Sequence, residues 1–235
     1  MAASISAERD GRAAVPGGSA PSALQLKIRL LSISPMIWRR VLMPETMRLR
    51  ELHGVIQVAM GWKSLHLFVF ERGGGRYGSR ELSAASPDVA LTSFRLRGGA
   101  KLIYRYDMTD GWAHEVRVEE RLDPPPGKPL PVCVAGAGAC PPEECGGPSG
   151  YLARRDEACG LDAYLDAALI VEVAQDIVDG TVPTALTDPI ERVELEDAVD
   201  RMRARQALLD TGFSRRAVNQ ALLAEAHLDR MHQWI

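Results

Sequence analysis

An acidic segment of this 235-residue chain carries the first side chains that could do chemistry. Asp107, Asp110 and His114 lie within eight residues of one another, and Glu143 and Glu144 follow in a Pro-rich stretch. Carboxylates and an imidazole together can hold a divalent ion and activate a water molecule, as hydrolases and nucleases do. This pattern makes Asp107, Asp110 and His114 the candidate catalytic residues.

The same residues also have a structural interpretation. Asp107 and Asp110 are typical turn residues, because their side chains accept hydrogen bonds from nearby backbone amides. His114 alternates with Trp112 and Val116 along an extended segment, so it shares their apolar face. The sequence favours this structural interpretation, with the catalytic one as its alternative.

Three cysteines at the spacing C-x6-C-x4-C form a second candidate site, namely Cys133, Cys140 and Cys145. A Zn²⁺ ion bound by three thiolates and one imidazole would order a loop that has few apolar residues of its own. The predicted zinc ligands are these cysteines and His114, with His53 and His66 as other sources of the imidazole. Alternatively, the small thiols pack against a sheet, as free cysteines commonly do.

Basic residues gather near the start of the chain, where they could contact phosphate groups. They are Lys27, Arg29, Arg39, Arg40, Arg48 and Arg50. We take Arg39, Arg40 and Arg48 as candidate nucleic-acid contacts. Neighbouring residues of a strand point to opposite faces, however, so Arg39 and Arg40 diverge if that segment is extended.

Hydrophobic periodicity predicts the elements that position these groups. Alternation indicates a strand over 24–30, and helical spacing indicates a helix over 49–60 that Gly61 would end. Further extended segments are expected at 37–43 and 65–70, and a hairpin at 101–120. Two strands, a helix and then more strands predict an α+β fold, in which one helix packs across a mostly antiparallel sheet.

The chain changes character after Asp123. Residues 123–150 are too rich in Pro and Gly for regular structure, and helices are expected at 161–179, from about 189 and from about 214. We therefore expect a disordered tail at 1–23, an α+β domain at 24–157 and a helical extension at 158–235. The last helices are similar to a ubiquitin-associated module or a helix-turn-helix, or they simply pack against the rest of the chain.

Three segments together resemble the plasmid pRiA4b ORF-3-like family, some of whose members are passengers in insertion elements. They are ISPMIWRRVLMPETMRLRELHGVIQVAMGW at 33–62, YDMTDGWAHEV at 106–116 and CVAGAGACPPEECGGPSGY at 133–151. The resemblance implies a single α+β domain over about 24–157 and no known activity. Where the family often has His-Leu-His or His-Leu-Tyr, this chain has His66-Leu67-Phe68.

Composition and missing motifs narrow the function. A net charge of −3 argues against a broadly basic nucleic-acid binder. No apolar run reaches the roughly 18 residues of a membrane helix, and no secretory signal is recognisable, which predicts a cytoplasmic protein. The chain also lacks a P-loop, a dinucleotide fingerprint and a nucleophile elbow.

These exclusions favour a non-enzymatic binding module associated with plasmids or mobile elements, with zinc as its candidate stabiliser. Its expected partner is another protein, with nucleic acid as the second class. The alternative is a metal-dependent hydrolase or nuclease.

Overall fold

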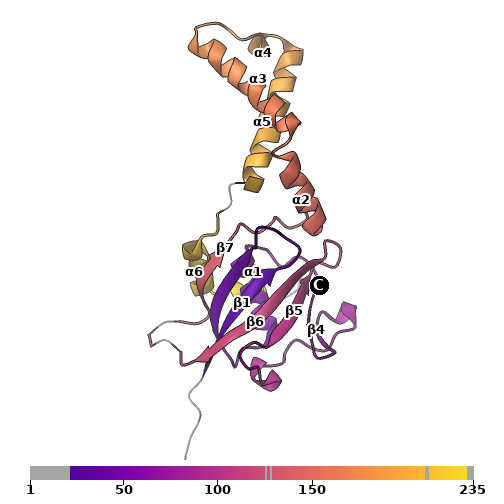
Figure 1. Cartoon of the computed structure of the whole chain (residues 1–235), viewed down its shortest axis with the longest axis vertical. Helices are drawn as coiled ribbons and strands as arrows, with labels where there is room; N and C mark the ends of the chain where they lie inside the picture. The colour runs from indigo at the N-terminus through magenta and orange to yellow at the C-terminus, as the bar shows by residue number, and fades with distance from the viewer. Residues whose placement is uncertain (1–21, 125, 128, 210–211, 232–235) are drawn as a thin grey trace, which may run out of the picture.

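A seven-stranded antiparallel sheet is the main feature of the fold (Figure 1). The computed structural model describes residues 22–124, 126–127, 129–209 and 212–231, so the predicted tail at 1–23 lies almost entirely outside the described residues. The strand order is β4-β3-β5-β6-β1-β2-β7. The strands are β1 (Ala23–Leu30), β2 (Trp38–Pro44), β3 (Phe68–Arg72), β4 (Gly75–Gly78), β5 (Lys101–Tyr106), β6 (Trp112–Leu122) and β7 (Val132–Ala137). The predicted α+β class is confirmed.

Alternation along the strands separates an inner face from an outer face. Leu24, Leu26 and Ile28 of β1 are buried, whereas Lys27 and Arg29, which alternate with them, are partly exposed on the outer face. The β5–β6 hairpin repeats this pattern, with Tyr104 opposite His114 and both side chains buried. The inner face of the sheet and helix α1 (Leu49–Met60) form the hydrophobic core.

Helix α1 begins and ends as the sequence predicts. Gly61 follows it with a left-handed φ of 90°, and its N–H donates to the carbonyl oxygen of Gln57. Nearly every residue of the helix is buried, which one sheet face cannot achieve alone. The other side of α1 is covered by the C-terminal helices α6 (Arg215–Leu223) and α7 (Ala226–Asp229). The C-terminal helices are therefore part of the core structure.

Two close contacts hold these C-terminal helices in place. Gly54 of α1 packs so tightly on α7 that a Cβ atom there would lie 2.0 Å from the carbonyl oxygen of His227. At the free edge of β7, the Asn219 side chain accepts from the N–H of Cys133 at 2.7 Å and donates to its carbonyl oxygen at 2.9 Å. The amide thus pairs with one backbone position of an otherwise open strand edge.

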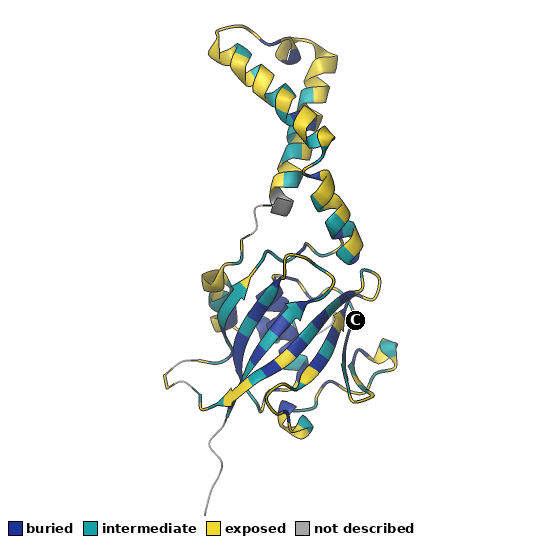
Figure 2. Cartoon of the chain, viewed as in Figure 1, coloured by how far each residue is buried: buried dark blue, intermediate teal, exposed yellow. Residues whose placement is uncertain are grey.

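The remaining helices extend away from the sheet (Figure 1). Helix α2 (Gly147–Glu157) leads into the helical arm, which we define as α3 (Leu161–Val178), α4 (Thr184–Thr187) and α5 (Pro189–Leu209). Helices α3 and α5 pack against each other and against α2. Figure 2 shows that most of the surface of the arm is exposed, in contrast to the strands.

Two regular elements lie in the stretch expected to be irregular, strand β7 and helix α2. The turn-rich segment after β3 also forms a short hairpin with β4, and β3 begins three residues later than predicted. Short 3-10 turns at Arg80–Leu82 and Leu91–Phe94 fill the connection to β5. None of the helices in the described part of the chain is long and apolar enough to cross a membrane.

The substitution Gly54→Ala tests the contact between α1 and α7. Alanine favours an isolated helix over glycine by about 1 kcal/mol, yet here its Cβ would meet backbone atoms of α7. We expect the free energy of unfolding to fall by about 1–3 kcal/mol, measured by urea denaturation. Gly98→Ala is the control, because its Cβ would lie 3.6 Å from its nearest neighbour. Equal stability of both variants would contradict the packing described.

Candidate functional site

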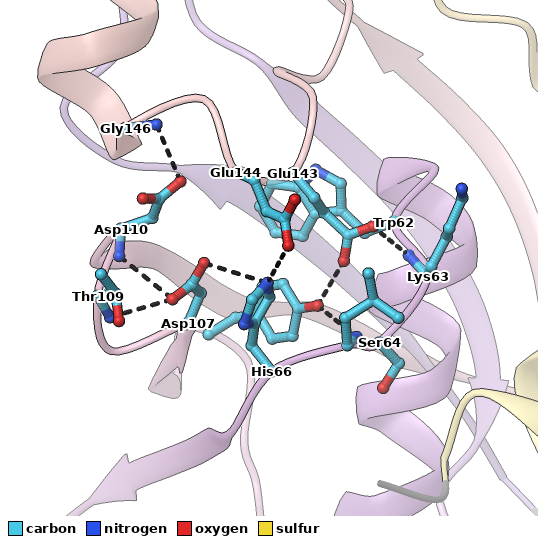
Figure 3. A network of polar contacts seen from close by, with 12 residues as sticks. Trp62, Lys63, Ser64, His66, Asp107, Thr109, Asp110, Glu143, Glu144 and Gly146 are labelled. Atoms are coloured by element: carbon cyan, nitrogen blue, oxygen red, sulfur yellow. Dashed lines mark hydrogen bonds and ion pairs between the residues drawn. The ribbon is translucent and has the colours of Figure 1, made fainter. Parts of the chain in front are cut away.

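Three segments that are distant in sequence meet at one end of the sheet (Figure 3). They are residues 62–66 after α1, the 107–111 turn between β5 and β6, and the 141–147 loop before α2. The indole Nε1 of Trp62 donates to the carbonyl oxygen of Pro141 at 2.7 Å. The N–H of Lys63 donates to Oε2 of Glu143 at 2.8 Å. These bonds fasten the first segment to the Pro-rich loop.

Tyr106 joins the same two segments from the sheet. Its hydroxyl donates to Oε1 of Glu143 at 2.5 Å and accepts from the N–H of Leu65 at 2.9 Å. Burial, and then the hydrogen bond to Glu143, raise the pKa of Tyr106, so that its hydroxyl remains a donor at neutral pH.

The acidic turn is fastened to the start of α2. Asp107 has a left-handed φ of 55°, and its Oδ1 accepts from the N–H groups of Thr109 and Asp110 at 3.0 and 3.2 Å. Oδ2 of Asp110 accepts from the N–H of Gly146 at 3.2 Å. A Cβ atom on Gly147 would lie 2.0 Å from the carbonyl oxygen of Asp110, so only glycine fits there. We call the hydrogen bonds of Trp62, Lys63, Tyr106, Asp110 and Glu143 the loop clamp.

An imidazole between two carboxylates lies beside the loop clamp. Nε2 of His66 is 3.5 Å from Oδ2 of Asp107 and 3.8 Å from Oε1 of Glu144. The Glu144 side chain is 70% exposed, whereas that of His66 is 28% exposed. An imidazole beside two carboxylates is a combination of groups that acid–base catalysts use.

His114 does not join this group, which corrects one part of the sequence prediction. It is fully buried between the rings of Trp62 and Tyr104, each with its centroid 5.3 Å away. Neither ring nitrogen has a hydrogen-bond partner among the described residues. Burial lowers the pKa of His114 to about 3. This histidine is a neutral core residue, as its alternation with Trp112 indicated.

The four predicted zinc ligands are not assembled into a metal site. Cys133 is buried in β7, where its thiol donates to the carbonyl oxygen of Ala135. Burial raises the pKa of the Cys140 and Cys145 thiols. Nowhere in the described residues do three or more His, Cys, Asp or Glu side chains form a group that could hold a metal ion. All four cysteines are free.

The three candidate nucleic-acid contacts also lie in different places. Arg39 is buried on the inner side of β2, and its Nε donates to the carbonyl oxygen of Ala59 at 2.9 Å. Arg40 points to the outer face and pairs with Glu119, while Arg48 lies 3.8 Å from Asp88 before α1. Arg39 and Arg40 point to opposite faces, as expected for neighbouring residues of a strand, so the three arginines do not form one phosphate-binding surface.

Sequence reasoning found some residues of the site and missed others. It placed Asp107, Asp110, Glu143 and Glu144 together, and the structure brings all four to this end of the sheet. It missed Tyr106, whose alternation with Tyr104 signalled only a core residue. A hydroxyl at the last position of a strand, next to a turn, was the available signal.

The fold and this site define a class of α+β protein in which an antiparallel sheet is closed at one end by three interlocked segments. The model of the family described as plasmid pRiA4b ORF-3-like protein matches residues 22–157, and the chain belongs to this family. All three interlocked segments lie within the matched range.

Two relatives support the same assignment. The uncharacterized protein y4hQ of Sinorhizobium fredii is 38% identical over 144 residues, which cover 55% of this chain and 70% of that protein. The crystal structure of MM3350, a protein of unknown function from Methanosarcina mazei Go1, superposes with a TM-score of 0.55 at 30% identity. That match covers 61% of this chain and 84% of the other.

The buried histidines predict how stability depends on pH. The pKa values of His53 and His114 are both lowered to about 3 in the folded chain, against about 6.5 when unfolded. Below pH 6.5 these two histidines therefore bind protons in the unfolded chain, whereas in the folded chain they stay neutral down to about pH 3. The free energy of unfolding should fall by up to about 1.4 kcal/mol per histidine per pH unit as pH decreases from 6.5 toward 3. Urea denaturation at pH 7, 6 and 5 measures this slope.

The substitution His114→Leu measures how much His114 contributes to this pH dependence of the free energy of unfolding. Because its ring nitrogens have no partners, we expect stability at pH 7 to change by less than about 1 kcal/mol. The free energy of unfolding should then fall less steeply below pH 6.5 than in the unmodified chain, while His53 and His227, whose pKa values burial also lowers, maintain part of the slope. An unchanged slope would show that His114 is not a buried neutral base.

Substitutions of Glu143 test the loop clamp. Glu143→Ala leaves the buried Tyr106 hydroxyl without its acceptor, so we expect the free energy of unfolding to fall by about 1–3 kcal/mol. Glu143→Gln keeps one carbonyl acceptor and should lose less. Asp107→Asn keeps Oδ1 as an acceptor and should leave stability nearly unchanged. A phosphatase or nuclease activity that Asp107→Asn abolishes at unchanged stability would instead indicate catalysis.

Proposed function

We propose that this protein is a non-enzymatic interaction module, in which the sheet domain (β1–β7 with α1) is the rigid part and the helical arm docks a protein partner. One observation carries the proposal. Among the described residues, ten of the fourteen exposed large hydrophobic side chains lie between Leu161 and Val193 of the arm. Exposed apolar side chains concentrated in one place are typical of a binding surface.

The polar contacts within the arm keep these hydrophobic side chains exposed to solvent. Asp166 of α3 is buried against α5, where it accepts from Nη2 of Arg201 at 2.7 Å and from Nη1 of Arg205 at 2.5 Å. The hydrogen bonds from Arg201, opposed in part by burial, lower the pKa of Asp166 to about 2. Because this ion pair fixes the rotation of α3 about its axis, the opposite side of the helix faces solvent.

The hydrogen bonds that the carboxylates of the candidate site make support a non-enzymatic function. Asp107 accepts from backbone N–H groups of its own turn, whereas Asp110 and Glu143 accept from N–H groups of neighbouring segments. Carboxylates engaged in this way hold loops together and are poor candidates for binding a reacting group. The enzyme alternative now rests on His66 between Asp107 and Glu144, in place of His114.

Two finer elements of the sequence prediction have less support. The link to plasmids or mobile elements rests on the description of the family. A nucleic-acid partner would have to bind the outer face of the sheet, where Arg40 already pairs with Glu119 and Lys101 with Glu115. A protein partner at the arm is the interpretation that we argue.

Complex formation in an extract of the organism that encodes the chain tests the docking role. We expect the chain to elute from a sizing column above its own 25.6 kDa, and Tyr164→Glu to elute at that mass, since the charge disrupts an apolar contact. Leu223→Glu on α6 is the matched control, because Leu223 is 64% exposed and Tyr164 70% exposed. Elution of the unmodified chain at the mass of one chain, from an extract concentrated until the chain is at high micromolar concentration, would refute docking by the arm.

A further inference from the structure

Helix α3 carries one continuous exposed row of side chains on the side that faces away from α5. Its members are Leu161, Tyr164, Ala168, Val171, Gln175 and Val178, and all six are exposed. We call this row the α3 stripe. The successive spacings are three, four, three, four and three residues, which is the pattern of a coiled-coil seam. A seam of this kind normally contacts a second helix.

The α3 stripe is its own complement when two copies run in opposite directions. The order of spacings is the same read from either end, so a two-fold axis can pass between Ala168 and Val171. Leu161 then faces Val178 of the second copy, and Ala168 faces Val171. The small alanines near the axis let the two helices approach closely.

The remaining pair of positions supplies specificity. Tyr164 of one copy faces Gln175 of the other, and the symmetry creates this pair twice. A phenolic hydroxyl and a side-chain amide can exchange a hydrogen bond, whereas a slipped register would leave both groups buried against apolar side chains. Polar groups in a seam are an established way to fix register.

Charge favours the antiparallel direction over the parallel one. Residues 171–200, which form the outer half of the arm, contain nine acidic residues and one arginine. Parallel arms would bring two such acidic halves together, and like charges repel. Antiparallel arms instead place each acidic half beside the inner half of the other arm, where three arginines stand against Asp162 and Asp166, a net charge of 3 − 2 = +1. Arg201 and Arg205 already pair with Asp166, so this direction mainly avoids the repulsion between the two acidic halves.

From these observations we infer that the partner docked by the helical arm is a second copy of this chain, bound through antiparallel pairing of the two α3 stripes. This inference rests on the proposed docking function and identifies the protein that docks on the arm. One helix face is a small contact compared with the roughly 800 Å² per partner of a standard interface. The dimer should therefore dissociate on dilution.

Sedimentation of the purified full-length chain tests the dimer. We expect a mass near twice 25.6 kDa at high micromolar concentration and a shift toward one chain on dilution. Val171→Glu places a charge next to the two-fold axis and should give only single chains. Val193→Glu is the matched control, since Val193 is 57% exposed and Val171 64% exposed, but Val193 lies on α5 outside the stripe. Circular dichroism should be the same for all three chains.

Engineered cysteines test the register in a Cys159→Ser background. The double variant Tyr164→Cys/Gln175→Cys should form a disulfide-linked dimer on oxidation, because the two positions face each other. Tyr164→Cys alone should not, since two copies of position 164 would lie about 16 Å apart along the axis. Cross-linking of the single variant would overturn the antiparallel arrangement.

The outcomes separate this inference from the function on which it rests. A chain that sediments at the mass of one chain at all concentrations overturns the dimer, and so does a dimer that tolerates Val171→Glu. If such a chain still elutes in a larger complex from the extract, docking by the arm stands and the occupant is a different protein. If neither association is found, both proposals fail.

Discussion

Backbone amides at the end of the sheet must find hydrogen-bond partners, and this requirement determines much of the structure. The loop before α2 is rich in Pro and Gly and forms no strand or helix of its own between Ala137 and Gly147. Polar backbone groups without a partner are costly when water is excluded. Glu143 and Asp110 accept from Lys63 and Gly146, and in doing so they position the loop against the sheet. The start of α2, and with it the direction of the helical arm, follows from these bonds.

The loop clamp and the core share side chains, so neither forms independently. Trp62 donates to Pro141 with its indole nitrogen while its rings pack against Tyr106 and Trp112. Behind it, Nδ1 of His53 lies 2.7 Å from the Tyr104 hydroxyl, and Nε2 lies 2.8 Å from the Ser64 hydroxyl. A change in the loop is therefore transmitted to α1 and the central strands. This coupling explains how polar residues can be essential to a fold without taking part in catalysis.

Periodicity predicted those parts of the fold in which burial alone decides the conformation. Strand β1 alternates strictly, and α1 repeats its apolar residues at helical spacing up to Gly61, so both were identified with boundaries within a residue or two. Strand β7 was missed because its sequence, VCVAGA, contains small residues and lies among prolines. It exists because the edge of β2 offers hydrogen-bond partners, which is information from outside the segment.

The candidate site was predictable only in part, for a related reason. A turn sequence indicates that Asp107 and Asp110 bend the chain, but it does not indicate which distant amide Asp110 will reach. Arg39 shows the same limit in a strand, because alternation assigns it a face without saying that α1 and Phe213 cover that face. His114 could be assigned to the core because its neighbours in the alternation, Trp112 and Val116, are plainly apolar.

The position of the arm within the chain bears on how it can bind. The family match ends at residue 157, yet α6 and α7, which follow the arm, complete the burial of α1. The arm is thus inserted between the sheet domain and its own C-terminal cover. On one side the loop clamp fixes the start of α2. On the other, Arg215 donates to the carbonyl oxygen of Val134, and Phe213 packs under Arg39.

The contacts of α2 with the loop clamp restrict the directions that the arm can take relative to the sheet. A surface held in this way loses little further freedom on binding, and a smaller apolar contact is then sufficient for association. The same attachment makes the loop clamp relevant to function, although its carboxylates need not touch any partner. Their contribution would be to fix the direction in which the α3 stripe faces.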